Sequence, residues 1–181
     1  INDTKLIKWF EKNMSSQILV KINNFLKNRL IELSGTLLVL SSIFLLIVIA
    51  SYSPGDPNFI YSPEIVEIEN LGGFYGSVVS DFLLQSVGLI SFLIVINLLF
   101  WGFRLITEKK IENFLPKIFF ILVYIIFGTT FINIFYYDSF WLIDNGNGGF
   151  IGRIVKENFY ALITLNENLY IFFSLLLLTI I

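Results

Sequence analysis

The sequence predicts an all-α membrane protein, and three observations lead to this fold class: the composition, the long apolar runs and the placement of the charges. Of the 181 residues, 56% are hydrophobic and only 14% are charged, whereas soluble domains are about 45–50% apolar and about 25% charged. Mean hydropathy is +0.79. We therefore expect four transmembrane helices arranged as two hairpins, with both termini cytoplasmic and amphipathic segments beside the membrane.

Four apolar segments define the expected domain, residues 33–181. Its approximate spans are 33–50, 82–106, 118–135 and 169–181, because a bilayer core of about 30 Å requires about 20 apolar residues. Outward loops are expected at 51–81 and 136–168, and an inner turn at 107–117. The fourth segment is too short to cross alone at about 1.5 Å per residue, so we expect the protein to continue beyond it.

Residues 1–32 are expected to form a basic amphipathic cytoplasmic tail. In the part from 17 to 30, Ile18, Ile22 and Phe25 fall at helical spacing opposite Lys21 and Lys27. This pattern is typical of a helix that lies in the headgroup region. Attraction to anionic lipid is the preferred interpretation of its cations, and contact with DNA is the alternative.

The cations also predict the orientation. Ten of the twelve Lys and Arg residues lie in this tail or between Arg104 and Lys117, and two lie in the outward loops. Because cytoplasmic segments carry the excess of Lys and Arg, the tail and the inner turn should be cytoplasmic. The two acidic loops should face the exterior.

The first outward loop is the stretch whose chemistry burial in lipid does not dictate. Two prolines flank a Gly-Asp pair near its start, which predicts a sharp turn after a helix that ends near Ala50. Asn70 is a possible N-cap for the next helix. The candidate partner-binding or loop residues are Tyr52, Pro54, Asp56, Pro57 and Phe59.

Small residues predict close helix packing at two places. Gly72, Gly76 and Ser80 recur every four residues; the preferred interpretation is a turn followed by a helix start, and the alternative is a smooth face for close helix packing at the membrane boundary. The segment Gly72-Gly73-Phe74-x-Gly76 aligns with Gly148-Gly149-Phe150-x-Gly152, which indicates a duplicated helix pair whose glycine turns lie at the same depth on the same side. The candidate packing residues are Gly72, Gly73, Gly76, Ser80, Asn97, Gly148, Gly149 and Gly152.

Two polar features inside the apolar part leave alternatives open. Asn97 lies within an expected span, where its amide either forms a hydrogen bond between helices or marks a pathway through the membrane. Residues 145–168 fit an interfacial amphipathic helix better than a span, because Asn166, Glu167 and Asn168 would otherwise lie deep in lipid.

Few residues of the types that commonly perform catalysis or bind metals are present in the chain. The chain contains no Cys and no His, which excludes thiolate catalysis, Cys-ligated zinc and the commonest proton shuttle. The phosphate-binding pattern G-x-x-x-x-G-K-[ST] is absent. We expect no catalytic residue, no metal site and no cofactor in this segment.

Residues of the first loop resemble a known family. The patterns Ser51-Tyr52-x-Pro54-x-Asp56-Pro57-x-Phe59 and Asn70-x-x-Gly73-x-x-Gly76-Ser77 are similar to the N-terminal four-helix membrane domain of the FtsK/SpoIIIE family of bacterial DNA translocases. The resemblance extends from Leu33 to the C-terminus. Asn58 departs from it, since members often have Ser at that place.

The resemblance implies a membrane anchor in the bacterial inner membrane at the division septum. It would position a cytoplasmic ATP-driven DNA motor and contact membrane proteins of the division machinery during chromosome segregation. ATP, Mg and DNA would bind only to the motor, which is absent from this segment and would assemble as a hexamer. The alternative is a small membrane transporter or channel subunit, which would use Asn97.

Overall fold

The structure, a computed structural model, describes residues 3–61, 67–110, 114–139, 142, 145–159 and 169–180. In this part of the chain all regular structure is helical, as the composition predicts. The elements are α1 (Asp3–Ala50), α2 (Gly73–Val87), α3 (Ile90–Glu108), α4 (Phe114–Phe135), α5 (Gly149–Phe159) and α6 (Leu169–Ile180).

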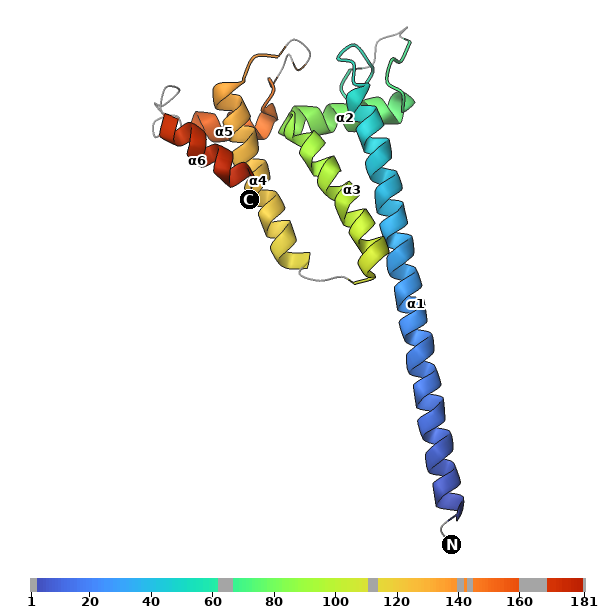
Figure 1. Ribbon diagram of the computed structural model, residues 1–181. Helices are drawn as coiled ribbons and strands as arrows, with labels where there is room; N and C mark the ends of the chain where they lie inside the picture. The colour runs from blue at the N-terminus through green and yellow to red at the C-terminus, as the bar shows by residue number, and fades with distance from the viewer. Residues whose placement is uncertain are drawn as a thin grey trace.

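The helices pack as two units that repeat one pattern. In the first unit α1 packs along α3 and α2 lies across their end; in the second α4 packs against α6 and α5 (Figure 1). Helices α2 and α5 contact each other at one end of the molecule, which we call the loop end. The α3–α4 turn lies at the opposite end, the turn end, and the N-terminal part of α1 projects beyond it.

Helix α1 runs for 48 residues without a break. It contains no proline and only one glycine, Gly35, so nothing in its interior interrupts the backbone hydrogen bonds. It ends at Ala50, as predicted. The segment 17–30, for which we expected a helix in the headgroup region, is helical and continues directly into the apolar part of α1.

The second apolar segment is divided. We expected one helix over 82–106, but α2 ends at Val87 and α3 begins at Ile90. Gly88 has φ +60°, and its N–H donates to the carbonyl of Leu84 at 2.8 Å, which terminates α2. The N–H of Leu89 donates instead to the carbonyl of Asn147 in the second unit at 2.9 Å. A contact between the units therefore fixes the bend.

Three of the described helices are long and apolar enough to cross a membrane: Gln17–Ala50 within α1, Ile90–Glu108, and Leu115–Phe135. At about 1.5 Å per residue, the 19 residues of α3 span about 28 Å, close to the thickness of a bilayer core. Large apolar side chains on these helices, such as Leu40, Phe100 and Phe119, are more than half exposed. Such surfaces suit a lipid environment, so the chain is a multi-pass membrane protein.

The four-span arrangement of the sequence prediction is met in part. Helix α6 has 12 residues, all within the expected fourth segment, and it is highly apolar. Helix α5, with 11 residues, is shorter than a span, in line with the preference for an interfacial helix there. Residues 160–168, which include Asn166, Glu167 and Asn168, lie outside the described residues.

A small core at the loop end holds the two units together. Val48, Ile49, Leu84 and Val95 of the first unit are fully or almost fully buried. Leu142, from the loop after α4, is 1% exposed and packs in the same cluster. The second unit thus contributes a side chain to the core of the first, at the end where the two loops meet.

Candidate functional site

Asp56 organises the loop that follows α1. Its side chain is 3% exposed, and its two oxygens accept hydrogen bonds from the backbone N–H groups of Glu69 and Asn70, both at 2.9 Å. The turn is set by Pro54 and Pro57, which fix φ on either side of Gly55 and Asp56. A carboxylate held by backbone donors closes the loop on itself. Asp56 is therefore placed inside the loop and not on its surface.

Asn70 connects this loop to the end of α1. Its side chain is 4% exposed, and its Nδ2 donates to the carbonyls of Val48 at 2.8 Å and Ser51 at 3.3 Å, and to the hydroxyl of Ser80 at 3.2 Å. The last carbonyls of a helix have no partner within the helix. Asn70 satisfies two carbonyls at the C-terminal end of α1 and joins this end to α2.

The expectation that Asn70 caps the next helix was wrong. The N-cap of α2 is Gly72, which forms no side-chain cap. The Oδ1 of Asn70 accepts the N–H of Gly72 at 2.9 Å and so makes a turn just before the helix. Gly76 lies against this side chain and against Val48, so that no room remains for a Cβ.

A second set of polar contacts crosses from the first unit to the second. The carboxylate of Asp81 accepts the hydroxyl of Tyr52 at 3.2 Å and the amide of Asn58 at 3.0 Å. The amide of Gln85 donates to the same Tyr52 hydroxyl at 3.4 Å and accepts from Asn145 at 2.9 Å. We call these five residues the bridging network, because Asn145 belongs to the loop after α4.

A groove lies beside the bridging network at the loop end. Its volume is about 520 Å³. It is lined by the loop after α1, by α2 and by α5, with Asn58, Tyr61, Asp81, Phe82, Phe150 and Arg153 among its walls. The groove thus combines charged and aromatic side chains from both units.

The other loop candidates lie around this groove or beside it. Phe59 lines the groove and is 84% exposed, with its ring 6.4 Å from that of Phe74 in an edge-on arrangement. The carbonyl of Pro57 accepts the hydroxyl of Ser77 at 2.8 Å, which attaches the turn to α2. Pro54 is exposed at the tip of the turn. Of the five loop candidates, only Tyr52 joins the bridging network.

The packing candidates occupy equivalent places in the two units. Gly72 and Gly76 lie against Val48 of α1, whereas Gly148 and Gly152 lie against Thr129 and Asn133 of α4. Each glycine pair therefore faces the helix that precedes it. Gly73 and Gly149 are the first residues of α2 and α5, with φ of +62° and +64°, and both helices lie at the loop end (Figure 1). Ser80 is fully buried and donates to the carbonyl of Ser77 at 3.0 Å.

Asn97 lies far from this site, on α3. Its Nδ2 donates to the carbonyl of Leu93 at 3.2 Å and contacts the hydroxyl of Tyr124 on α4 at 3.5 Å. The latter distance is at the limit of a hydrogen bond. Together these contacts give the amide a partner on its own helix and one on α4.

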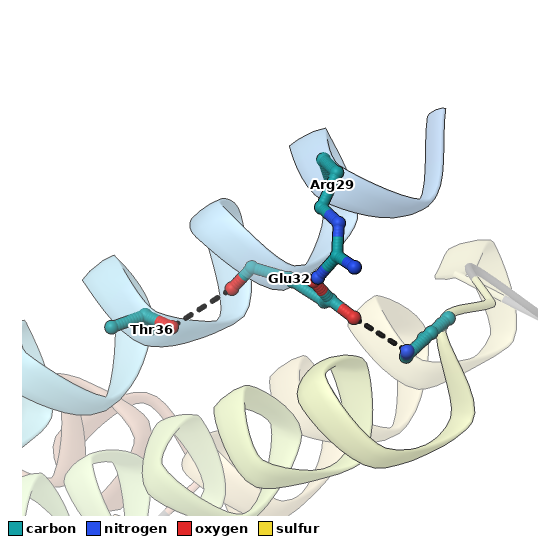
Figure 2. Close-up of polar contacts among 4 residues, drawn as sticks. Arg29, Glu32 and Thr36 are labelled. Atoms are coloured by element: carbon teal, nitrogen blue, oxygen red, sulfur yellow. Dashed lines mark hydrogen bonds and ion pairs between the residues drawn. The ribbon is translucent and has the colours of Figure 1, made fainter. Parts of the chain in front are cut away.

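Charged side chains join α1 to α3 at the turn end. Glu32 forms ion pairs at 2.5 Å with Arg29 on its own helix and with Lys109, which follows α3 (Figure 2). The hydroxyl of Thr36 donates to the carbonyl of Glu32 at 2.9 Å. The hydrogen bond from Lys109 lowers the pKa of the Glu32 carboxyl; desolvation acts against this shift, and Arg29 adds to it. The stretch Gln17–Ala50 is longer than the roughly 20 residues that a bilayer core requires, and Lys109 follows the end of the span Ile90–Glu108, so the contact lies at the edge of the membrane.

Sequence reasoning missed several residues of the bridging network. Asn58 was noted only as a departure from the family pattern, yet its Oδ1 also accepts the N–H groups of Ile60 and Tyr61 at 2.8 and 2.7 Å. An Asn directly after a Pro in a loop is a known signal for such a turn. Gln85 and Asn145 carry no local signal, because their contact joins residues 60 positions apart.

Comparison with known proteins places the chain in a family. Residues 27–181 match the family described as the 4TM region of DNA translocase FtsK/SpoIIIE. The match covers the membrane region and no motor domain. No solved structure matches the chain.

Curated relatives agree with this match. The chain is 30% identical over 180 residues to a DNA translocase FtsK of Vibrio vulnificus, covering 89% of this chain and 16% of the relative. It is 31% identical over 140 residues to the DNA translocase FtsK of Rickettsia prowazekii, and this alignment covers 77% of this chain and 18% of the relative. It is 32% identical over 90 residues to the DNA translocase FtsK of Azospirillum brasilense, and this alignment covers 49% of this chain and 14% of the relative.

The chain spans less than a fifth of the length of these relatives. The family match covers most of the chain, and it includes the loop turn and both glycine pairs. The chain therefore belongs to the family of the 4TM region of the DNA translocases FtsK and SpoIIIE.

Proposed function

We propose that this chain is the membrane anchor of a septal DNA translocase. In this role it holds a cytoplasmic ATP-driven DNA motor at the division site and contacts membrane proteins of the division machinery, so that chromosomes are segregated as the septum closes. The observation that carries the proposal is the family match over residues 27–181, in a chain whose long helices are built for lipid.

The distribution of charge supports a cytoplasmic turn end. Arg104, Lys109, Lys110 and Lys117 lie at or near the α3–α4 turn, and the N-terminal part of α1, with six more cations, projects at the same end (Figure 1). Cytoplasmic segments of inner-membrane proteins carry such an excess of cations. In this orientation the loop end faces the periplasm or exterior, and a motor attaches on the side of the turn end.

The chemistry of translocation belongs, in this proposal, to the part of the protein that the chain does not include. The relatives named DNA translocase are more than five times longer than the matched segment. ATP, Mg and DNA would bind to that motor, and the motor would bring six copies of the anchor together. The anchor itself supplies position and contact surfaces.

The loop end is the part of the anchor with surfaces suited to a protein partner. Asp56 and Asn70 fix the loop after α1 from within, while Phe59 and Tyr61 of the same loop are 84% and 52% exposed. Exposed aromatic side chains on a fixed backbone are typical of protein interfaces. We assign partner binding to this end.

Localisation in dividing cells tests the anchor function. The chain is fused at its C-terminal end to a fluorescent protein and imaged in cells that keep their own translocase. We expect a band at midcell during constriction, and an even distribution over the membrane would contradict the proposal. As a control for insertion, single cysteines at Ser53 and Lys110 should react with a membrane-impermeant maleimide only from outside and only from inside, respectively.

A further inference from the structure

The groove at the loop end has a polar floor that carries a negative charge. Asp81 lines it, and the partners of its carboxylate are two neutral groups, the Tyr52 hydroxyl and the Asn58 amide. Among the described residues Asp81 forms no ion pair. Two hydrogen bonds hold the carboxylate in place but leave its charge uncompensated, so the floor favours a cationic group from outside.

Part of the lining of the groove is apolar and exposed. Ile60 and Phe82 are 97% and 69% exposed, and Phe59, also on the wall, is 84% exposed. Singly exposed apolar side chains are common on proteins, but three of them around one concave site mark an interaction surface. The groove therefore offers contacts for one or two apolar side chains beside the site for a cation.

The surroundings of the groove strengthen its preference for cations. In these two loop regions, the described residues between 51 and 81 and between 136 and 159 include six Asp and Glu but only two Lys and Arg. One of the two, Arg153, lines the groove and is engaged with its own helix, over the ring of Phe150 at 5.7 Å and 4.0 Å from Glu157. The field at the loop end thus attracts positively charged segments and repels acidic ones.

We propose that this groove binds a juxtamembrane peptide segment of a membrane-anchored partner, a segment that places a Lys or Arg on Asp81 and an apolar side chain between Phe59 and Phe82. This inference rests on the proposed function, because it describes the surface by which the anchor recognises a division partner. It goes beyond that function by naming the site and the chemistry of the partner.

The position of the groove fits a partner that shares the membrane. The groove is formed partly by α2, which lies across the N-terminal end of the membrane-spanning α3 (Figure 1). A chain that leaves the membrane beside α3 reaches the groove within a few residues. Confinement to the same membrane also raises the effective concentration of the partner, so that a small site of about 520 Å³ suffices.

A cross-linking experiment tests the proposal with a defined probe. The probe is a designed single-span helix whose outward juxtamembrane segment reads Leu-Lys-Phe next to one Cys, and the matched probe reads Leu-Glu-Phe. Because the chain contains no Cys, Ile60→Cys provides a single thiol on the groove wall. Leu71→Cys provides a control thiol that is 77% exposed and does not line the groove. Both proteins are reconstituted in phosphatidylcholine vesicles and oxidised.

We expect the Lys probe to form a disulfide with Ile60→Cys about fivefold more often than the Glu probe does, and to favour Ile60→Cys over Leu71→Cys. Asp81→Asn should abolish the preference for Lys, whereas Glu69→Gln, which removes an equal charge outside the groove, should keep it. Phe82→Ala should lower the yield with both probes. Each variant is first checked for an unchanged thermal unfolding midpoint.

Three results would overturn the inference. The first is equal cross-linking at Ile60→Cys and Leu71→Cys, and the second is a preference for Lys that persists in Asp81→Asn. The third is cross-linking at Ile60→Cys that appears only after lipid is removed in detergent, which would assign the groove to lipid. Midcell localisation is scored in a separate experiment. If the chain forms a midcell band but the probe assay fails, only the assignment of the groove is rejected. If the probe assay succeeds but no midcell band forms, only septal anchoring is rejected.

Discussion

The Oδ2 of Asp56 lies 2.9 Å from the backbone N of Asn70, across a separation of 14 residues, and this contact fixes the loop that follows α1. Asn70 in turn donates to the carbonyl of Val48 at 2.8 Å. A carboxylate, a backbone amide and a side-chain amide therefore connect the end of α1 to the loop that follows it. Asp56 and Asn70, which hold this arrangement, both lie within the region that matches the family, residues 27–181.

Replacing Asp56 by Ala should destabilise the loop end. The change leaves two backbone N–H groups without their acceptor, and each unpaired buried donor costs about 1–3 kcal/mol. Thermal unfolding in detergent and hydrogen exchange of the Glu69 and Asn70 amides measure the effect. Glu69→Ala removes an exposed carboxylate from the same loop and should change neither reading. Unprotected amides in the native chain would contradict the structural role of Asp56.

Replacing Gly88 by Ala should weaken the contact between the units more than the same change at Gly73. Both glycines have positive φ, +60° and +62°, and Gly88 has ψ −142°, close to a backbone region that is nearly restricted to glycine and costs other residues about 1–3 kcal/mol. At Gly88 the new methyl would also overlap the carbonyl of Asn147, whereas at Gly73 it meets no described atom within 4 Å. The difference in unfolding midpoint between the two variants measures the backbone cost at Gly88 together with the lost contact to Asn147. Equal midpoints would show that the units do not meet there.

Replacing Lys109 by Gln should raise the pKa of Glu32 toward its ordinary value, because the hydrogen bond from Lys109 is the largest cause of its depression. Since the folded pKa lies below the unfolded one, the pair stabilises the fold at neutral pH, and this contribution disappears as the pH falls through the folded pKa. Carboxyl chemical shifts in an NMR titration report the value. Glu108→Gln, which breaks the Arg104 pair instead, should leave the Glu32 titration unchanged.

Replacing Asn97 by Leu distinguishes an anchor from a transporter. The amide of Asn97 contacts the Leu93 carbonyl and the Tyr124 hydroxyl, which is the arrangement of a polar contact between helices. We expect vesicles that contain the chain to pass ions and small solutes no faster than protein-free vesicles, with or without the substitution. Flux that Asn97→Leu abolishes would support the alternative function. Thr107→Val, at a hydroxyl bonded within α3, is the control for a general change in packing.

Local sequence signals sufficed for several of the helix ends in this chain. Pro54 and Pro57 indicated the end of α1 at Ala50, and the paired glycines indicated the starts of α2 and α5, because such residues alter backbone geometry where they stand. The repeat at Gly72 and Gly148 was visible for the same reason. These features depend on neighbours in sequence.

The missed features depend on contacts that bring distant parts of the chain together. Gly88 ends α2 in a segment whose apolar composition alone favours one long helix, and the bend is held by Asn147 from the second unit. The burial of Asp56 depends on the backbone N–H groups of Glu69 and Asn70, which lie 13 and 14 residues further along the chain. The groove is invisible in the sequence, because Asp81 and Phe150 approach only after α2 and α5 have packed together.

The unbroken length of α1 has a mechanical consequence. At about 1.5 Å per residue its 48 residues form a rod of about 72 Å, with one end beyond the turn end and the other beneath the Asn70 side chain (Figure 1). A rod without a hinge transmits torque and axial displacement along its whole length. A twist applied to the projecting segment would turn Val48 against Asn70, so strain at one end of α1 would reach the loop at its other end.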